Sequence, residues 1–276
     1  MGRRASNLIP GSQPPPSPAV SRELPILGHS QNLVAVHNLI EQVLPSYWKA
    51  IAPDAGEAEW VSAIGTRLVV RLDTPADFIG RAVHAPWLAA QQFIGWCRDS
   101  GWFPFAWAIE TPNEPMSAWD PRLGRYIEFE KFVLDGLRDL GKECIVSNMG
   151  TGNDGHEVPG AIYYGAHEYG WPEVLSQAPW HALRYRSWFP AILGKVPEAK
   201  LFFTEYGITH AVLSGNPDVG WETGELDPMN YAKSIRDFLS EAATDEYVVA
   251  GFLFQIGGNS DWGSFEWPSQ INLLEY

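Results

Sequence analysis

Two glutamates stand where the sequence could support acid, base or nucleophilic chemistry. Glu114 follows the apolar run at residues 105–109, and Glu205 follows the apolar run at residues 201–203. Two carboxyl groups about 5 Å apart can cleave an acetal, because one protonates the leaving oxygen while the other attacks the anomeric carbon. The two glutamates are far apart in the sequence, so this chemistry requires a fold that brings the two runs together.

Such a fold is indicated by a regular alternation along the chain. From residue 23 onward, short β-forming apolar runs alternate with segments whose apolar residues repeat every three or four positions, which is typical of parallel βα units. The expected strands are residues 24–27, 47–51, 68–72, 105–109, 144–146, 162–165, 201–203 and 248–254. Eight strands with helices between them fit a (β/α)8 barrel of roughly 250 residues. We therefore predict an α/β fold, a single (β/α)8 TIM barrel, over residues 23–276.

The beginning of the chain helps to define this fold. A doubly wound sheet, the alternative, needs fewer strands and usually starts with a glycine-rich turn of the form GxGxxG. Residues 28–31 read Gly-His-Ser-Gln instead, so the barrel is favoured.

Residues 1–22 contain the sequence Pro-Pro-Pro-Ser-Pro, which is unsuited to a helix or a central strand. We expect a disordered, proline-rich lead there, which could tether the barrel to a larger protein.

Composition and charge exclude several classes of partner. The net charge of −14 repels nucleic acid and anionic lipid, and no cluster of Lys and Arg is present to bind either. The sequence has no run of about 18 apolar residues that could span a membrane. Residues 7–18 are polar and proline-rich where a secretory signal would be apolar. We expect a monomer without a signal peptide and without a nucleic-acid or membrane partner, and the cellular location stays open.

Neither the cysteines nor the histidines show the spacing of a metal site. Cys97 and Cys144 lie within apolar patterns and are expected in the core. His156 and His210 have no partner at the spacing of metal ligands. The sequence therefore predicts neither a metal ion nor another cofactor.

The predicted barrel indicates where functional residues should lie. In this fold the active site forms at the carboxyl ends of the strands, so polar residues that close a strand are the candidates. They are Arg71, Asp73, Asn113, Glu114, Asn148, His167, Tyr169, Glu205, Tyr206 and Gln255. Glu114 follows the fourth strand and Glu205 the seventh, and these strands face each other across the mouth of a barrel. We expect the two carboxyl groups to meet there.

These residues also match a family pattern. Residues 113–115 read Asn-Glu-Pro, which resembles a motif of the clan A glycoside hydrolases, a group that includes the family 5 cellulases. Residues 204–207, Thr-Glu-Tyr-Gly, resemble the nucleophile motif of that clan, and residues 167–169 are similar to its His-x-Tyr motif. In that clan the acid/base follows the fourth strand and the nucleophile the seventh. The resemblance implies a retaining glycoside hydrolase with Glu114 as general acid/base and Glu205 as nucleophile.

The resemblance also implies roles for neighbouring residues. Asn113 would offer its amide to the 2-hydroxyl of the sugar. The Tyr169 hydroxyl and the Arg71 guanidinium would keep the nucleophile ionised. His167 would contribute to substrate binding, and Trp262 would stack on a sugar. The acid/base must begin protonated, so we expect it in apolar surroundings or near the negative charge of the nucleophile.

Aromatic residues bear on the substrate. Trp119, Trp171, Trp221, Trp262 and Trp267 lie in segments after strands, where their rings would either line a cleft for a chain of sugars or anchor loops. We expect an endo-acting enzyme for a β-linked oligo- or polysaccharide, with β-1,3-glucan, β-1,4-glucan and mannan all open. The alternative is a non-catalytic barrel that binds polysaccharide, although such a barrel has no need of both glutamates. Carboxyl groups about 5 to 5.5 Å apart fit retention, and about 6.5 to 9.5 Å fits inversion.

Overall fold

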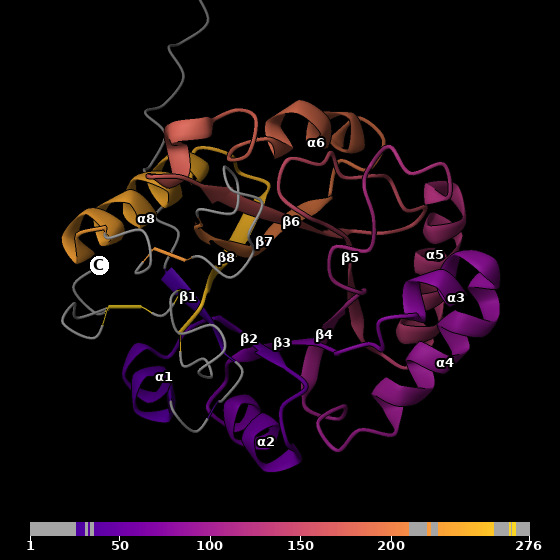
Figure 1. The fold of residues 1–276 in the computed structure, drawn as a ribbon. Coiled ribbons are helices and arrows are strands. Elements are labelled where there is room, and N and C mark those ends of the chain that lie inside the picture. Colours follow the sequence, from indigo (N-terminus) through magenta and orange to yellow (C-terminus); the bar gives the residue numbers. More distant parts are fainter. Residues whose placement is uncertain are drawn as a thin grey trace, which may run out of the picture.

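Eight parallel strands form a closed barrel, and the helices lie around it (Figure 1). The computed structural model describes residues 26–30, 33, 36–209, 220–221, 226–256, 265 and 267–268. The strands pair in sequence order from β1 to β8, and β8 pairs with β1. The predicted single (β/α)8 barrel is therefore confirmed. The lead expected at residues 1–22 and Trp262 lie outside the described residues.

Strands and helices alternate along most of the chain, except that residues 150–162 connect two strands without a helix. The strands are β1 (Ile26–Ser30), β2 (Tyr47–Ile51), β3 (Arg67–Arg71), β4 (Ala106–Glu110), β5 (Glu143–Met149), β6 (Tyr163–Gly170), β7 (Lys200–Ile208) and β8 (Val248–Phe254). The helices are α1 (His37–Val43), α2 (Ala55–Ala63), α3 (Phe78–His84), α4 (Pro86–Arg98), α5 (Leu123–Asp139), the 3-10 helix η2 (Val174–Gln177), α6 (Tyr185–Leu193) and α8 (Pro228–Ala242). Among the described residues, no helix is both long and apolar enough to cross a membrane.

Local sequence signals begin and end the helices. The Asp54 carboxylate caps α2 by accepting the backbone N–H of Glu57 at 2.8 Å. Asp227 caps α8 through its carboxylate, and Pro228 takes the first helical position. After α5 the chain turns at Gly141, whose φ of +72° is a left-handed conformation that glycine adopts without strain. These signals fix where each helix returns the chain to the barrel.

β6 and β7 run further than the sequence predicted. Their apolar runs end early, but the ladder between the two strands continues to Gly170 and Ile208. Polar residues can extend a strand because the ladder is made by backbone groups, whatever the side chains are. As a result His167, Tyr169 and Glu205, which were expected after the strands, lie within them.

A bulge in β7 decides which way Glu205 points. Phe202 packs inside the barrel and Phe203 packs outside it, so simple alternation would direct Glu205 toward the helices. The register between β6 and β7 shifts after Phe203 and leaves Thr204 as an extra residue. An extra residue reverses the alternation that follows it. Glu205 therefore faces the interior of the barrel at its mouth.

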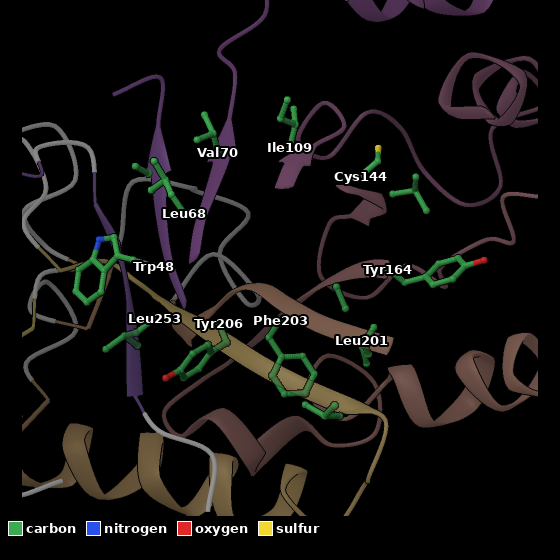
Figure 2. Packing of buried hydrophobic residues seen from close by; sticks show 14 of the residues in the cluster. Trp48, Leu68, Val70, Ile109, Cys144, Tyr164, Leu201, Phe203, Tyr206 and Leu253 are labelled. Atoms are coloured by element: carbon green, nitrogen blue, oxygen red, sulfur yellow. The ribbon is translucent and has the colours of Figure 1, made fainter. Parts of the chain in front are cut away.

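Two apolar clusters support this arrangement. The inner cluster fills the barrel below its mouth and consists of Leu27, Val69, Ala108, Ile145, Phe202, Ala250 and Phe252. The larger outer cluster lies between strands and helices, and Figure 2 shows part of it. There Phe203 and Tyr206 pack against Phe238 of α8, with ring centroids 5.1 and 5.5 Å apart. Cys97 and Cys144 are free and buried, which confirms their expected place in the core.

Candidate active site

Glu114 and Glu205 meet at the mouth of the barrel. Glu205 lies on β7 with its side chain 8% exposed, whereas Glu114 lies on the loop after β4 with its side chain 49% exposed. One carboxylate oxygen of each residue and a ring nitrogen of His167 all lie within 4.8 Å of one another. The fold therefore brings the two carboxyl groups together, and solvent reaches the pair from the Glu114 side.

Glu114 is held in an uncommon backbone conformation. Its φ of +42° falls in the left-handed region, which residues other than glycine adopt only when the surroundings stabilise it. The carbonyl oxygen of Asn148 on β5 accepts the Glu114 N–H at 2.9 Å. The Nδ1 atom of His167 lies 2.7 Å from Oε1 of Glu114. A Cβ atom at Gly150 would lie only 3.0 Å from the Glu114 carboxyl carbon, so glycine leaves the room that this carboxyl group occupies.

Glu205 is surrounded by hydrogen-bond donors and positive charges. The Tyr169 hydroxyl donates to Oε2 at 3.1 Å, and Arg71 donates from Nη1 to Oε1 in a close contact. The Nζ atom of Lys49 lies 3.7 Å from Oε1, and Nδ1 of His29 lies 3.8 Å from the same oxygen. These contacts come from four different strands, so the barrel itself fixes the orientation of this carboxylate.

These neighbours keep Glu205 ionised. Burial alone would raise its pKa, but the charges of His167, Arg71 and Lys49 outweigh burial and hold the pKa well below its usual range. Burial and the nearby Glu205 carboxylate raise the pKa of Tyr169 well above its usual value. The Tyr169 hydroxyl therefore keeps its proton and donates it in the hydrogen bond to Glu205.

Arg71 joins the nucleophile motif to the Asn-Glu-Pro motif. Its Nη1 atom donates to Oδ1 of Asn113 at 2.8 Å and also to Glu205. The Asn113 side chain is thus oriented by its oxygen, and its NH2 group is left to make other hydrogen bonds. Six of the seven site residues expected from the sequence lie together, and the seventh, Trp262, is outside the described residues.

Sequence reasoning missed three buried groups near Glu205. Lys49 was taken as one residue of a strand, yet its fully buried ammonium group lies 3.0 Å from Oε2 of Glu110. Glu110, which directly follows the apolar run at residues 105–109, is a buried ion-pair partner on β4. His29 on β1 was seen only as part of a turn. The available signal was a charged residue inside each of two apolar strands.

A second buried network lies behind the loop after β4. Glu130 on α5 accepts the Thr111 hydroxyl at 2.7 Å and the Ser147 N–H at 2.8 Å, and it closely contacts Nε2 of His156. Glu130 stands four residues after Tyr126, on the apolar face of α5, and this position was the signal in the sequence. The network fixes the first residue of the loop that carries the acid/base candidate.

The tryptophans in the segments after the strands divide into two groups. Trp221 and Trp267 are buried in the outer cluster and anchor loops, whereas Trp171 is partly buried and packs against the cluster. Trp119, on the loop after β4, is 79% exposed. Trp180, between β6 and α6, is 69% exposed and was not singled out in the sequence. Both exposed rings lie on loops at the carboxyl ends of the strands.

Distance alone would also allow Glu114, His167 and Glu205 to surround a cation. Their surroundings argue against this. Arg71 and Lys49 already place two positive charges within 4 Å of Glu205, and a further cation would be repelled by both. The electrostatics favour a carboxylate held by cations of the protein itself.

No protein-family model and no curated protein matches this sequence. Solved structures do match its fold. A β-glucuronidase from Ruminococcus gnavus aligns with a TM-score of 0.56 and 13% identity over 84% of this chain and 43% of its own. An endo-1,4-β-D-mannanase from Thermotoga petrophila aligns with a TM-score of 0.53 and 12% identity over 90% of this chain and 93% of its own. This chain thus spans less than half of the glucuronidase and most of the mannanase, and it shares with both the barrel fold of the glycoside hydrolases that its motifs resemble.

Proposed function

We propose that this protein is a retaining glycoside hydrolase that cleaves β-linked glycans, with Glu205 as nucleophile and Glu114 as general acid/base. The observation that carries the proposal is the pair of carboxylate oxygens within 4.8 Å of each other. A spacing of about 5 Å fits direct attack by one carboxylate, because about 6.5 to 9.5 Å is needed to place a water molecule between carboxylate and sugar. The two environments also differ: one carboxylate is buried among cations and the other is open to solvent.

In the first step the Glu205 carboxylate attacks the anomeric carbon from the face opposite the leaving group. Glu114, in its acid form, gives its proton to the glycosidic oxygen as the bond between carbon and oxygen breaks. The products are a free sugar hydroxyl on the leaving group and a glycosyl ester on Glu205. Configuration at the anomeric carbon is inverted once.

In the second step Glu114, now a carboxylate, removes a proton from water. The oxygen of that water attacks the anomeric carbon, and the Glu205 carboxylate leaves with the bonding electrons. The second inversion restores the original configuration. Arg71 and Tyr169 keep Glu205 ionised and oriented for the first step, and in the second step they stabilise the negative charge that returns to it.

The site also suggests how a sugar is oriented. Asn113, held through its oxygen by Arg71, directs its NH2 group to the 2-hydroxyl of the bound sugar. His167 contacts Glu114 and keeps its carboxyl group beside the scissile bond. Trp119 and Trp180 are exposed on loops at the same end of the barrel and suit a polymer with several sugars outside the cleavage site. We therefore propose endo action on β-glucan or mannan, supported by the likeness to a neighbour named as an endo-1,4-β-D-mannanase.

The proposal is tested with dyed β-1,3-glucan, β-1,4-glucan, mannan and xylan, each with and without a metal chelator. We expect cleavage of at least one polymer, unaffected by the chelator, and loss of cleavage in Glu205→Gln. Proton NMR early in the reaction should show the new reducing end in the β configuration. Binding of a polymer without cleavage, equal in native protein and Glu205→Gln, would favour a non-catalytic binding barrel instead.

A further inference from the structure

A fully buried lysine lies directly behind the candidate nucleophile. Lys49 on β2 donates from Nζ to the carbonyl oxygen of Thr204 at 2.7 Å. The same Nζ lies 3.0 Å from Glu110 Oε2 and 3.7 Å from Glu205 Oε1. An ammonium group has three protons, and three acceptors surround this one. Thr204 is the bulge residue of β7, so Lys49 contacts the backbone that turns Glu205 inward as well as the carboxylate itself.

The charges around Lys49 balance. Lys49 and Arg71 are the cations, and Glu110 and Glu205 are the anions, so this group of four has no net charge. A lone buried ammonium group is strongly disfavoured, and burial does lower the pKa of Lys49, but the carboxylates of Glu110 and Glu205 oppose this shift. Glu110 is thus the counter-charge that allows an ammonium group to remain behind the nucleophile.

We propose that Lys49 is a positioning residue for glycoside cleavage: it keeps Glu205 ionised and fixes the β7 bulge that aims Glu205 at the sugar. The inference rests on the proposed function of Glu205 as nucleophile. Lys49 would not touch the substrate, because it is fully buried on the side of Glu205 away from the mouth of the barrel. It acts on the reaction through the charge and the orientation of Glu205.

Other titratable groups also face Glu205, and the test must separate Lys49 from them. They are His29 on β1, Arg71 on β3, Glu110 on β4, Glu114 on the loop after β4, and His167 and Tyr169 on β6. Burial, followed by the charges of Lys49 and Arg71, holds the pKa of His29 well below its usual value, so His29 is neutral in the working range. A probe is therefore needed whose reaction depends on Glu205 and not on the acid/base.

A 2-deoxy-2-fluoro glycosyl fluoride of the sugar that the enzyme cleaves is such a probe. Its fluoride leaves without a proton, so labelling needs the Glu205 carboxylate but no general acid. The rate of labelling is measured against pH by intact mass, and the labelled residue is identified by peptide mass. In the native protein we expect an adduct on Glu205. Absence of that adduct would overturn the proposed function itself.

Lys49→Met tests the inference. Without the ammonium charge, Glu205 takes up a proton at a higher pH. The acid limb of the profile, where the labelling rate falls as pH is lowered, should therefore move up by about one pH unit or more. Lys49→Met with Glu110→Gln should show a smaller shift in the same direction, because losing the Glu110 carboxylate also removes a repulsion on Glu205. This variant has no unpaired buried charge, which guards against misfolding of the single variant. A role confined to structure would lower the labelling rate at every pH without moving the limb.

Lys142→Met is the matched control. Lys142 also donates to backbone carbonyl oxygens, those of Pro104 and Ala106, but at the amino end of β4. We expect this variant to leave the acid limb in place. An unmoved limb in the folded double variant, or an equal shift in Lys142→Met, would overturn the role of Lys49 while leaving Glu205 as the labelled residue.

Discussion

Asn148 accepts the Thr204 hydroxyl at 3.0 Å through its side-chain oxygen, while its backbone carbonyl oxygen accepts the N–H of Glu114 at 2.9 Å. Thr204 precedes Glu205, so a single residue of β5 is bonded to both segments that carry the carboxyl groups. The side-chain NH2 group donates to the carbonyl oxygens of Thr111 and Ile145. The distance between the two carboxyl groups is therefore set in part by a residue that touches neither of them.

Asn148→Ala should lower both stability and activity. The change leaves buried partners without hydrogen bonds, which costs about 1–3 kcal/mol in free energy of unfolding. Gly165→Ala should have a similar effect, because its added Cβ atom would lie 1.9 Å from the Asn148 side-chain oxygen. In the double variant the two losses should not add, since the alanine at 165 then has no amide to displace. Denaturant unfolding and kcat for polymer check this, and additive losses would contradict it.

Glu205→Gly should become an azide-dependent enzyme. The variant lacks the nucleophile, but Glu114 can still protonate the leaving group, and azide can occupy the vacated space. Azide then attacks from the side where Glu205 stood, so the product should be an α-glycosyl azide from a β-glycoside. Without azide, cleavage of polymer should fall by about two orders of magnitude or more. NMR of the azide product provides the measurement.

Glu114→Gly should give the opposite stereochemistry. An aryl glycoside with a good leaving group needs no proton, so the ester on Glu205 still forms in this variant. Azide then attacks the ester from the other face and yields a β-glycosyl azide. If the two variants gave each other's products, the assignments of Glu114 and Glu205 would have to be exchanged.

Glu168 should make the native protein less stable as pH rises. It lies on β6 between His167 and Tyr169, buried on the outer side of the barrel, and burial raises its pKa to about 8 although backbone N–H groups near the start of α6 oppose the shift. Between the unfolded pKa of about 4.3 and this value, the folded state holds the proton more tightly. Its contribution to stability is complete at low pH and falls by up to about 1.4 kcal/mol per pH unit until pH passes the folded pKa.

Glu168→Gln removes this titration. Denaturant unfolding of the native protein and the variant at pH 5 and pH 8 should show a stability difference that changes in favour of the variant as pH rises. A difference that is independent of pH would contradict a protonated Glu168.

Trp119→Ala and Trp180→Ala should weaken the use of polymer selectively. Each ring offers a flat face to a sugar. Removing a ring should cost about 1 kcal/mol of polymer binding free energy, which corresponds to about a fivefold rise in KM for polymer. Hydrolysis of a small aryl glycoside should not change. Trp87→Ala is the matched control, because Trp87 is 51% exposed and lies on helix α4 instead of on a loop that follows a strand. Equal effects of all three variants would contradict a substrate role for the two rings.

The barrel and the carboxylate pair could be predicted because both depend on patterns that are visible in one amino-acid sequence. Alternating apolar runs define strands, and the residue after an apolar run is at the mouth of the barrel. The same rule failed for β6 and β7, where His167, Tyr169 and Glu205 are polar residues inside strands. The sequence pattern shows where the side chains become polar, but the backbone pairing of the strands continues beyond that point.

The surroundings of Glu205 were harder to predict. The Thr204 bulge has no glycine or proline to mark it, and its effect depends on the register with a neighbouring strand. Lys49 and Glu110 are charged residues inside apolar runs, which signals burial, but their pairing depends on how β2, β4 and β7 curve around the barrel. Contacts that involve three strands cannot be predicted from the order of residues along any one of them.

The two carboxyl groups differ in how freely evolution or design could move them. Glu205 is fixed by a strand bulge and by side chains from several strands, so its displacement would disturb the whole barrel. Glu114 lies on a loop, and its position depends on its own left-handed backbone conformation and on the small size of Gly150. A change in stereochemical outcome, which requires a wider gap for a water molecule, would therefore be reached by rebuilding the loop after β4 while the rest of the scaffold stays as it is.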